Sequence, residues 1–228
     1  MLRRGTTGRR AGLAIAVLAI GAMVCAGIAL AASDTIVAGP ADSFSQATYN
    51  TDQGAVVQFQ NNGGSHNVTA RQTGPDGSAL FRSPTVSGGT TGVQGTHFLS
   101  GGDYAFFCSV HPTTMSGTLH VTGNGTPQPR PTAQLSVRSK KLAKVSKKGI
   151  LVAITTNAKV DDASLVAKLG KTTIGKVDGL SLAAGQQFAT VKLTKAGKNK
   201  LKGKKKASVS VTATIPFGSP AKAKSKLT

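Results

Sequence analysis

Three side chains that can bind a metal lie close together near the middle of the chain. The segment CSVHPTTM, residues 108–115, contains the thiol of Cys108, the imidazole of His111 and the thioether of Met115. A soft thiolate combined with imidazole suits copper or zinc. Structural zinc sites typically use several cysteines in paired spacing, and this chain has only two cysteines in all.

A second histidine lies upstream, in the segment NNGGSHNVTA. Two histidines and one cysteine in a trigonal arrangement, with a weak axial methionine, form the blue-copper centres that transfer electrons. His66 follows a Gly-Gly turn and is well placed to supply the second imidazole. The residue types therefore favour one type 1 copper over zinc.

The sequence around these residues resembles the cupredoxins. VVQFQNNGGSHNVTA followed by GGDYAFFCSVHPTTMSGTLHV is similar to the plastocyanin, pseudoazurin and amicyanin branch of that family, and the likeness covers most of residues 34–123. The resemblance implies a Greek-key β-sandwich with copper at one end. It also implies that His66, Cys108 and His111 are equatorial copper ligands, that Met115 is the axial ligand, and that His111 passes single electrons to redox partner proteins.

The ligand loop departs from the family pattern in two respects. Three residues separate His111 from Met115, where plastocyanins have four and amicyanins have two. Ser65 stands where a proline commonly precedes the first histidine. Next to that histidine, Asn67 is expected to hydrogen-bond across to the Cys108 loop and to hold the site in shape.

Short alternating strands position these residues. In DYAFFC, Tyr104, Phe106 and Cys108 fall on one face of a strand. In GTLHV, Leu119 and Val121 share a face and His120 lies on the other. Strands of this length with frequent Gly and Pro turns predict an all-β sandwich or barrel.

The N-terminus is typical of an export signal. Four arginines precede an uncharged apolar run over residues 11–32, which ends in ALAAS. We interpret residues 1–32 as a signal peptide or N-terminal membrane anchor, which predicts an extracellular, periplasmic or cell-surface protein. Cys25 lies inside the run as an apolar residue.

Charge divides the remaining chain into two halves. Residues 33–125 carry two basic and five acidic side chains, a net charge of −3. Residues 126–228 carry 22 basic and three acidic side chains, a net charge of +19. The Pro- and Gly-rich segment GNGTPQPRPTA marks the change. We therefore predict a cupredoxin domain over residues 33–123, a linker over 124–132 and a second domain over 133–228.

The basic half is also β-patterned, and its length of about 95 residues suits an immunoglobulin-like sandwich without its disulfide. The charged segment KAGKNKLKGKKK within it predicts a turn or a short helical connection. The basic half contains no His, Cys or Glu, which disfavours a metal-based or hydrolytic active site in this half. Its strands are expected in the segments AQLSVRS, GILVAITTN, ASLVAKLG, FATVKLT, ASVSVTATI and AKAKSKLT.

Other functions fit the sequence less well. Copper enzymes need further histidine ligands, and only His97 and His120 remain, both expected to be exposed strand or loop residues without a metal role. We therefore expect no enzyme activity. Copper storage would favour Met- and His-rich tracts, which the chain lacks. A copper-binding or copper-storage protein, or a structural cell-surface protein, without an electron-carrier role is the alternative.

The lysines of the basic half have two interpretations. They either form an ordinary solvated surface or bind an anionic envelope polymer or lipid surface. Nucleic acid is disfavoured, because Phe188 and Phe217 are the only aromatic residues after residue 125 and cannot form a stacking platform.

Overall fold

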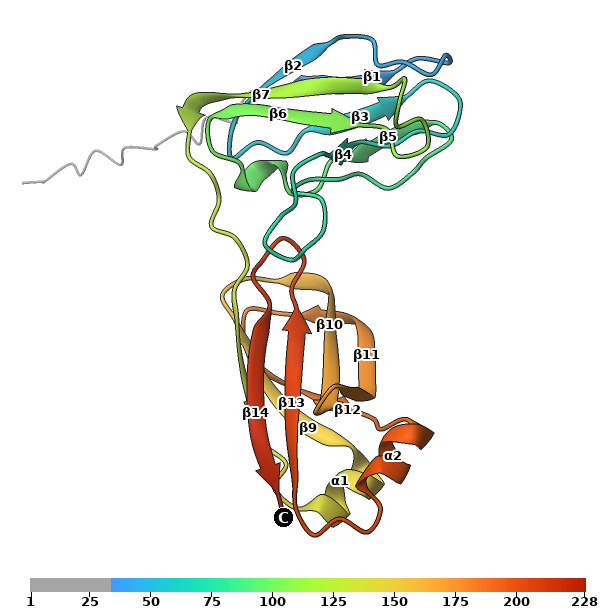
Figure 1. Ribbon diagram of the computed structural model, residues 1–228. Helices are drawn as coiled ribbons and strands as arrows, with labels where there is room; N and C mark the ends of the chain where they lie inside the picture. Colours follow the sequence, from blue (N-terminus) through green and yellow to red (C-terminus); the bar gives the residue numbers. More distant parts are fainter. Residues whose placement is uncertain (1–33) are drawn as a thin grey trace, which may run out of the picture.

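The structure is a computed structural model that describes residues 34–228. It is built mostly of β-strands arranged in two parts, one above the other in Figure 1, as the all-β prediction requires. No helix between residues 34 and 228 has the length and apolarity needed to cross a bilayer. The predicted signal peptide or anchor over residues 1–32 lies outside the described residues.

The N-terminal part is a sandwich of two sheets. One sheet has the order β1-β3-β5 and the other β2-β7-β6-β4. The pairs β1–β3 and β2–β7 are parallel, and the remaining pairs are antiparallel. The elements are β1 (Thr35–Ala38), β2 (Thr48–Gln53), β3 (Gln58–Asn61), β4 (Thr69–Ala70), β5 (Gly89–Gly92), the 3-10 helix η1 (Thr96–Phe98), β6 (Gly102–Phe107) and β7 (Ser116–Gly125).

The core between these sheets follows the alternation of the strands. Phe106, Leu119 and Val121 are buried, and His120 on the opposite face of β7 is exposed, as predicted. The ring of Phe106 meets that of Phe44 edge-on, with centroids 4.9 Å apart. Apolar burial of this kind stabilises the sandwich and fixes the register of β6. That register places the residue after Phe107 at one end of the sandwich.

The C-terminal part is a second pair of sheets, with the orders β11-β10-β13-β14 and β12-β9-β8. All of their paired strands are antiparallel. The immunoglobulin-like assignment of this part stays a prediction. The elements are β8 (Ala133–Val137), α1 (Leu142–Lys148), β9 (Ile150–Thr156), β10 (Val160–Leu169), β11 (Thr172–Leu182), β12 (Gly185–Val191), α2 (Lys195–Leu201), β13 (Ala207–Thr214) and β14 (Ala221–Leu227).

Helix α1 and strand β11 of this part were not predicted. The short helical connection was predicted and corresponds to α2. The sequence of α1, LAKVSKK, buries only Leu142 and Val145, and two apolar residues in seven give too short a periodic signal. The sequence of β11 contains Gly175, Gly179 and Asp178, which are residues that disfavour strands. Pairing with β10 across several register shifts overrides that preference.

Phe217, in the turn between β13 and β14, joins the two parts. Its amide donates to Asp76 Oδ2 at 2.9 Å, and its ring lies 4.5 Å below the guanidinium of Arg82. A Cβ at Gly95 would come within 2.7 Å of that ring, so the close approach requires glycine. From the linker, Arg130 donates to the carbonyl of Phe217 at 3.1 Å. These contacts fix the basic part against the loops of the N-terminal part.

His97 lies at the same joint, and the expectation that it is exposed is wrong. Its imidazole is partly buried against Phe98, with ring centroids 3.8 Å apart. Burial, and then the positive charge of Arg130, hold the pKa of His97 below its usual value. The sequence alone did not show this, because Gln128 and Arg130 of the linker reach His97 only in the folded chain.

Candidate metal centre

His66 follows a turn that a buried asparagine holds in place. The side-chain amide of Asn61 donates to the carbonyl oxygens of Gly64 at 2.9 Å and of Val86 at 2.7 Å. The amide of Gly63 donates back to Asn61 Oδ1 at 3.1 Å. His66 itself exchanges two backbone hydrogen bonds with Val86. The His66 backbone is therefore fixed from both sides, and its side chain is fully buried.

Gly64 is required by the position of the His66 ring. Its φ of +74° lies in the left-handed region, which favours glycine. A Cβ there would stand 2.6 Å from His66 Nε2. The Gly-Gly pair thus permits the turn and also leaves room for the buried imidazole.

Cys108 and the following residues form a closed, hydrogen-bonded loop. Cys108 directly follows strand β6 and is fully buried. Its amide donates to the carbonyl of Met115 at 3.0 Å, and the amide of His111 donates to the carbonyl of Cys108 at 3.1 Å. A third bond joins the Met115 amide to the His111 carbonyl at 3.0 Å. The spacing of the segment CSVHPTTM therefore folds His111 back beside the thiol.

His66, Cys108 and His111 form one group at the end of the sandwich, and their candidate ligand atoms all lie within 4.8 Å of one another. Cys108 Sγ is 4.0 Å from His66 Nδ1 and 3.8 Å from His111 Nδ1. Metal bonds of about 2.3 Å to sulfur and about 2.0 Å to nitrogen, at angles of about 120°, place these atoms about 3.7 Å apart. The group thus fits a metal bound in a trigonal arrangement.

Burial supports the same conclusion. His66 Nε2 is buried without a hydrogen-bond partner, and the partner of Nδ1 is the Cys108 sulfur at 4.0 Å. A buried polar group left unsatisfied typically costs about 1–3 kcal/mol. A metal would bind at Nδ1, the nitrogen that faces the Cys108 sulfur, and Nε2 would then carry the ring proton. One thiol and two imidazoles, those of Cys108, His66 and His111, are donor types that suit copper.

Asn67 connects the two ligand segments, as predicted. Its amide nitrogen donates to Ser109 Oγ at 2.7 Å, and its oxygen accepts from the Ser109 amide at 2.8 Å. A third bond reaches Thr85 Oγ1 at 2.9 Å. These bonds tie the residue after His66 to the residue after Cys108. They hold the distance between the two ligands without help from a metal.

Asp42 is a residue of this centre that the sequence did not reveal. Its Oδ1 lies 3.3 Å from His111 Nε2, the ring nitrogen that faces away from Cys108. A carboxylate in that position orients a metal-binding imidazole. Asp42 belongs to the loop between β1 and β2, and no local pattern links it to the CSVHPTTM segment.

Met115 is fully buried in the core beside the centre. Its backbone pairs with both Cys108 and His111, which places the residue at the closing end of the loop. Its role as an axial ligand stays a prediction. His120, in contrast, lies on the exposed face of β7 and pairs with Asp103 at 2.6 Å, outside the metal-binding group.

Met115→Leu is expected to retain copper and to raise the reduction potential. If the thioether is the predicted weak axial donor, its loss would destabilise Cu(II) more than Cu(I). The swap nearly conserves volume and should cost less than about 1.5 kcal/mol of stability. Voltammetry and absorption spectra of the copper-loaded variant measure the effect.

Met115→Gln supplies a harder oxygen donor and is expected to shift the potential in the opposite direction. It is therefore the matched control for Met115→Leu. If Met115→Leu changes neither the potential nor the spectrum, Met115 is a core residue only.

Comparison with known proteins agrees with this centre. Residues 34–122 match the family model of copper binding proteins of the plastocyanin/azurin family. This segment is therefore a cupredoxin domain, as the resemblance implied, and the match does not extend into the basic half. The family match and the His66–Cys108–His111 group together support one copper per chain.

Several solved structures are similar to this chain over about the same share of its length. A tryptophan-to-tyrosine mutant of amicyanin in the reduced state is 21% identical over 39% of this chain and 81% of its own, with a TM-score of 0.32. A proline-to-glycine mutant of amicyanin in its reduced Cu(I) form at pH 4 is 25% identical over 40% of this chain and 84% of its own, with a TM-score of 0.31. A purple cupredoxin from Nitrosopumilus maritimus is 24% identical over 39% of this chain and 100% of its own, with a TM-score of 0.31. No curated protein matches the chain.

Proposed function

We propose that the protein is an exported type 1 copper protein that carries single electrons between redox partner proteins. The observation that carries this proposal is the His66–Cys108–His111 group at one end of a cupredoxin domain. Copper bound there would supply a one-electron couple. The protein's own part is to hold three ligands in a fixed arrangement, so that little rearrangement accompanies electron gain or loss.

The exposure of the ligands supports an exit for the electron at His111. The His66 and Cys108 side chains are fully buried, whereas the His111 side chain is 25% exposed. Val110, next to it on the same loop, is 43% exposed and offers an apolar contact. A redox partner that docks on this loop would therefore meet the His111 edge first.

A copper enzyme is the less favoured function. Within residues 34–228, the metal-binding side chains form a single group. His97 lies at the joint between the two parts and His120 pairs with Asp103, so neither extends the centre. Catalytic copper sites need further ligands with an open position for substrate. The arrangement supports electron transfer in preference to chemistry on a substrate.

Reconstitution with Cu(II) tests the proposal. We expect one copper per chain, an intense visible thiolate-to-copper band, and a reversible one-electron wave in voltammetry. Stoichiometric copper binding without a reversible wave would favour the alternative, a copper-binding or structural cell-surface protein. Binding of zinc alone would contradict the type 1 assignment.

The basic half suggests a tether to an anionic surface of the cell envelope. Export is part of this proposal and rests on the arginine-led apolar run over residues 11–32. The net charge of +19 after residue 125 favours attraction to polyanions outside the cell. We expect the protein to bind an anionic matrix at low ionic strength and to dissociate steeply as salt screens the charges. Absence of binding at low salt would mean that the lysines are merely solvated.

A further inference from the structure

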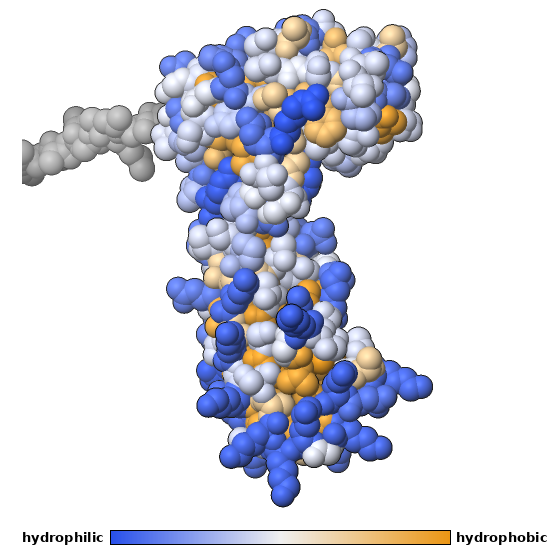
Figure 2. Space-filling view, viewed as in Figure 1, coloured by the Kyte–Doolittle hydropathy of each residue, from blue (hydrophilic) through white to orange (hydrophobic). Residues whose placement is uncertain are grey.

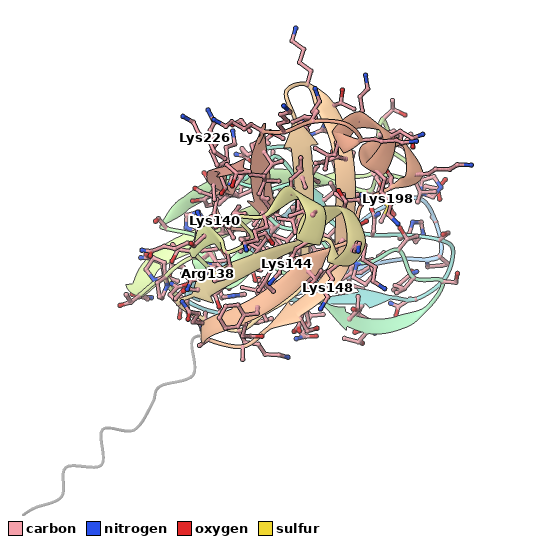
Figure 3. All side chains as sticks on the ribbon, turned by 90° about the horizontal axis from the view of Figure 1, so that it is seen from below. Arg138, Lys140, Lys144, Lys148, Lys198 and Lys226 are labelled. Carbon is pink, nitrogen blue, oxygen red and sulfur yellow. The ribbon has the colours of Figure 1, made fainter. Side chains whose placement is uncertain are left out.

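Many basic side chains of the C-terminal part gather at the end farthest from the N-terminal part (Figures 2 and 3). The three acidic residues of this part lie elsewhere. Asp161 and Asp162 line a cavity at the joint with the N-terminal part, and Asp178 pairs with Lys176 at 3.0 Å. The far end therefore has a strongly positive field that no acidic side chain of this part neutralises.

A groove of about 440 Å³ opens at this end, between α1 and the ends of β8, β9 and β12. Figure 3 shows Lys144 and Lys148 along α1, with Arg138 and Lys140 beside them. Lys144 and Lys148 are four residues apart on one helix, a like-charge spacing that destabilises a helix slightly. Among the described residues, no ion pair involves the cations that line the groove: Arg138, Lys140, Lys141, Lys144 and Lys148.

The groove continues onto the outer face of the sheet β12-β9-β8. Strand register places exposed Thr190 opposite Leu151 and exposed Phe188 opposite Ala153. Leu151 lines the groove and is 39% exposed, while Phe188 is 61% exposed. Hydroxyl and amide side chains flank this apolar strip on the neighbouring positions of the same face: Gln134, Ser136, Thr155 and Gln186.

The strip and the groove together suit an acidic sugar chain. The apolar C–H face of a sugar ring packs on an exposed aromatic ring, and its hydroxyls bond to amide and hydroxyl side chains. Acid groups along the same chain would pair with the ammonium and guanidinium groups of the groove.

A membrane surface and nucleic acid fit less well. Leu142 and Val145, the apolar residues of α1, are buried in the core, so the helix has no apolar face to insert into lipid. Single-stranded nucleic acid needs successive aromatic platforms, and in the described part of the chain Phe188 is the only exposed aromatic ring on this sheet face.

We propose that this surface binds a linear acidic polysaccharide, with sugar rings over Phe188 and Leu151 and acid groups along Arg138, Lys144 and Lys148. The inference rests on the proposed tether function of the basic half and adds its ligand class and its site. The joint around Phe217 then holds the N-terminal part, and with it the metal centre, away from this surface.

Binding of the copper-loaded full-length protein to polygalacturonate tests this inference, with polyphosphate, anionic phosphatidylglycerol vesicles and neutral dextran as the other probes. We expect polygalacturonate to bind most tightly. Phe188→Ala should weaken that binding by about five- to tenfold, the size of one aromatic contact. Because Phe188 is mostly exposed, the fold should be unaffected, which thermal unfolding checks.

Two double variants separate the groove from general charge. Lys144→Gln/Lys148→Gln should weaken binding and lower the slope of log affinity against log salt by about two. The matched control, Lys222→Gln/Lys224→Gln, removes the same charge from exposed positions on β14 and should retain nearly all affinity.

Three results would overturn the inference. Equal losses in the two double variants would indicate diffuse attraction. Polyphosphate or vesicles that bind as tightly as polygalacturonate, without any effect of Phe188→Ala, would indicate a surface that recognises charge alone. If no polyanion binds the unaltered protein at low salt, the tether itself is wrong, whereas the copper function remains separately testable.

Discussion

Cys108→Ser is expected to abolish the intense visible band of the copper-loaded protein. The band requires charge transfer from thiolate to copper, and Cys108 supplies a sulfur that lies within 4.0 Å of both imidazoles. A hydroxyl is a harder and weaker donor, so copper affinity should also fall. Absorption spectroscopy and copper titration measure both effects.

Serine is close in size to cysteine, so the metal-free fold should survive and the comparison stays informative. Met115→Leu serves as the control, because it changes a buried neighbour in the same loop and should keep the band. A Cys108→Ser protein that retained the band would show that the sulfur is not a ligand and would remove the blue-copper assignment.

Gly64→Ala is expected to reduce copper affinity by about 10- to 100-fold, the range seen when groups that support metal ligands are altered. The new methyl group would stand 2.6 Å from His66 Nε2, so the buried ring must shift away from residue 64 and lose its present placement beside Cys108. Copper titration against a competing chelator measures the change.

Gly77→Ala is the matched control for this effect. Gly77 has a φ of +82°, close to that of Gly64, but a Cβ there would meet nothing within 4 Å. Both variants should lose about 1 kcal/mol of stability through backbone strain. Only Gly64→Ala should lose copper. Equal copper affinities in the two variants would show that His66 is free to move or is not a ligand.

Most of the candidate ligands of the metal centre could be predicted from the sequence, because the spacing between three of them is local. Cys108, His111 and Met115 lie within one loop, and backbone hydrogen bonds between them depend on that spacing. The alternation of β6 and β7 indicated which side chains point inward, because the side-chain period of a strand is two. His66 was found by its residue type and its glycine turn, and the structure brings it to the thiol.

Helix α1 and strand β11 could not be predicted from the sequence, and the reason is physical. Their local preferences are weak, and packing against the rest of the C-terminal part decides their conformation. His97 was misjudged in the same way, because Gln128 and Arg130, which lie beside it, come from the linker.

The sequence by itself determined the all-β class, the change of charge near residue 125 and the identity of the candidate copper ligands. Only the tertiary structure placed Asp42 beside His111, brought Phe217 into contact with Asp76 and Arg82, and aligned Phe188 with the basic groove. These contacts join residues far apart in the chain. Such contacts depend on strand register and domain packing, which no local pattern encodes.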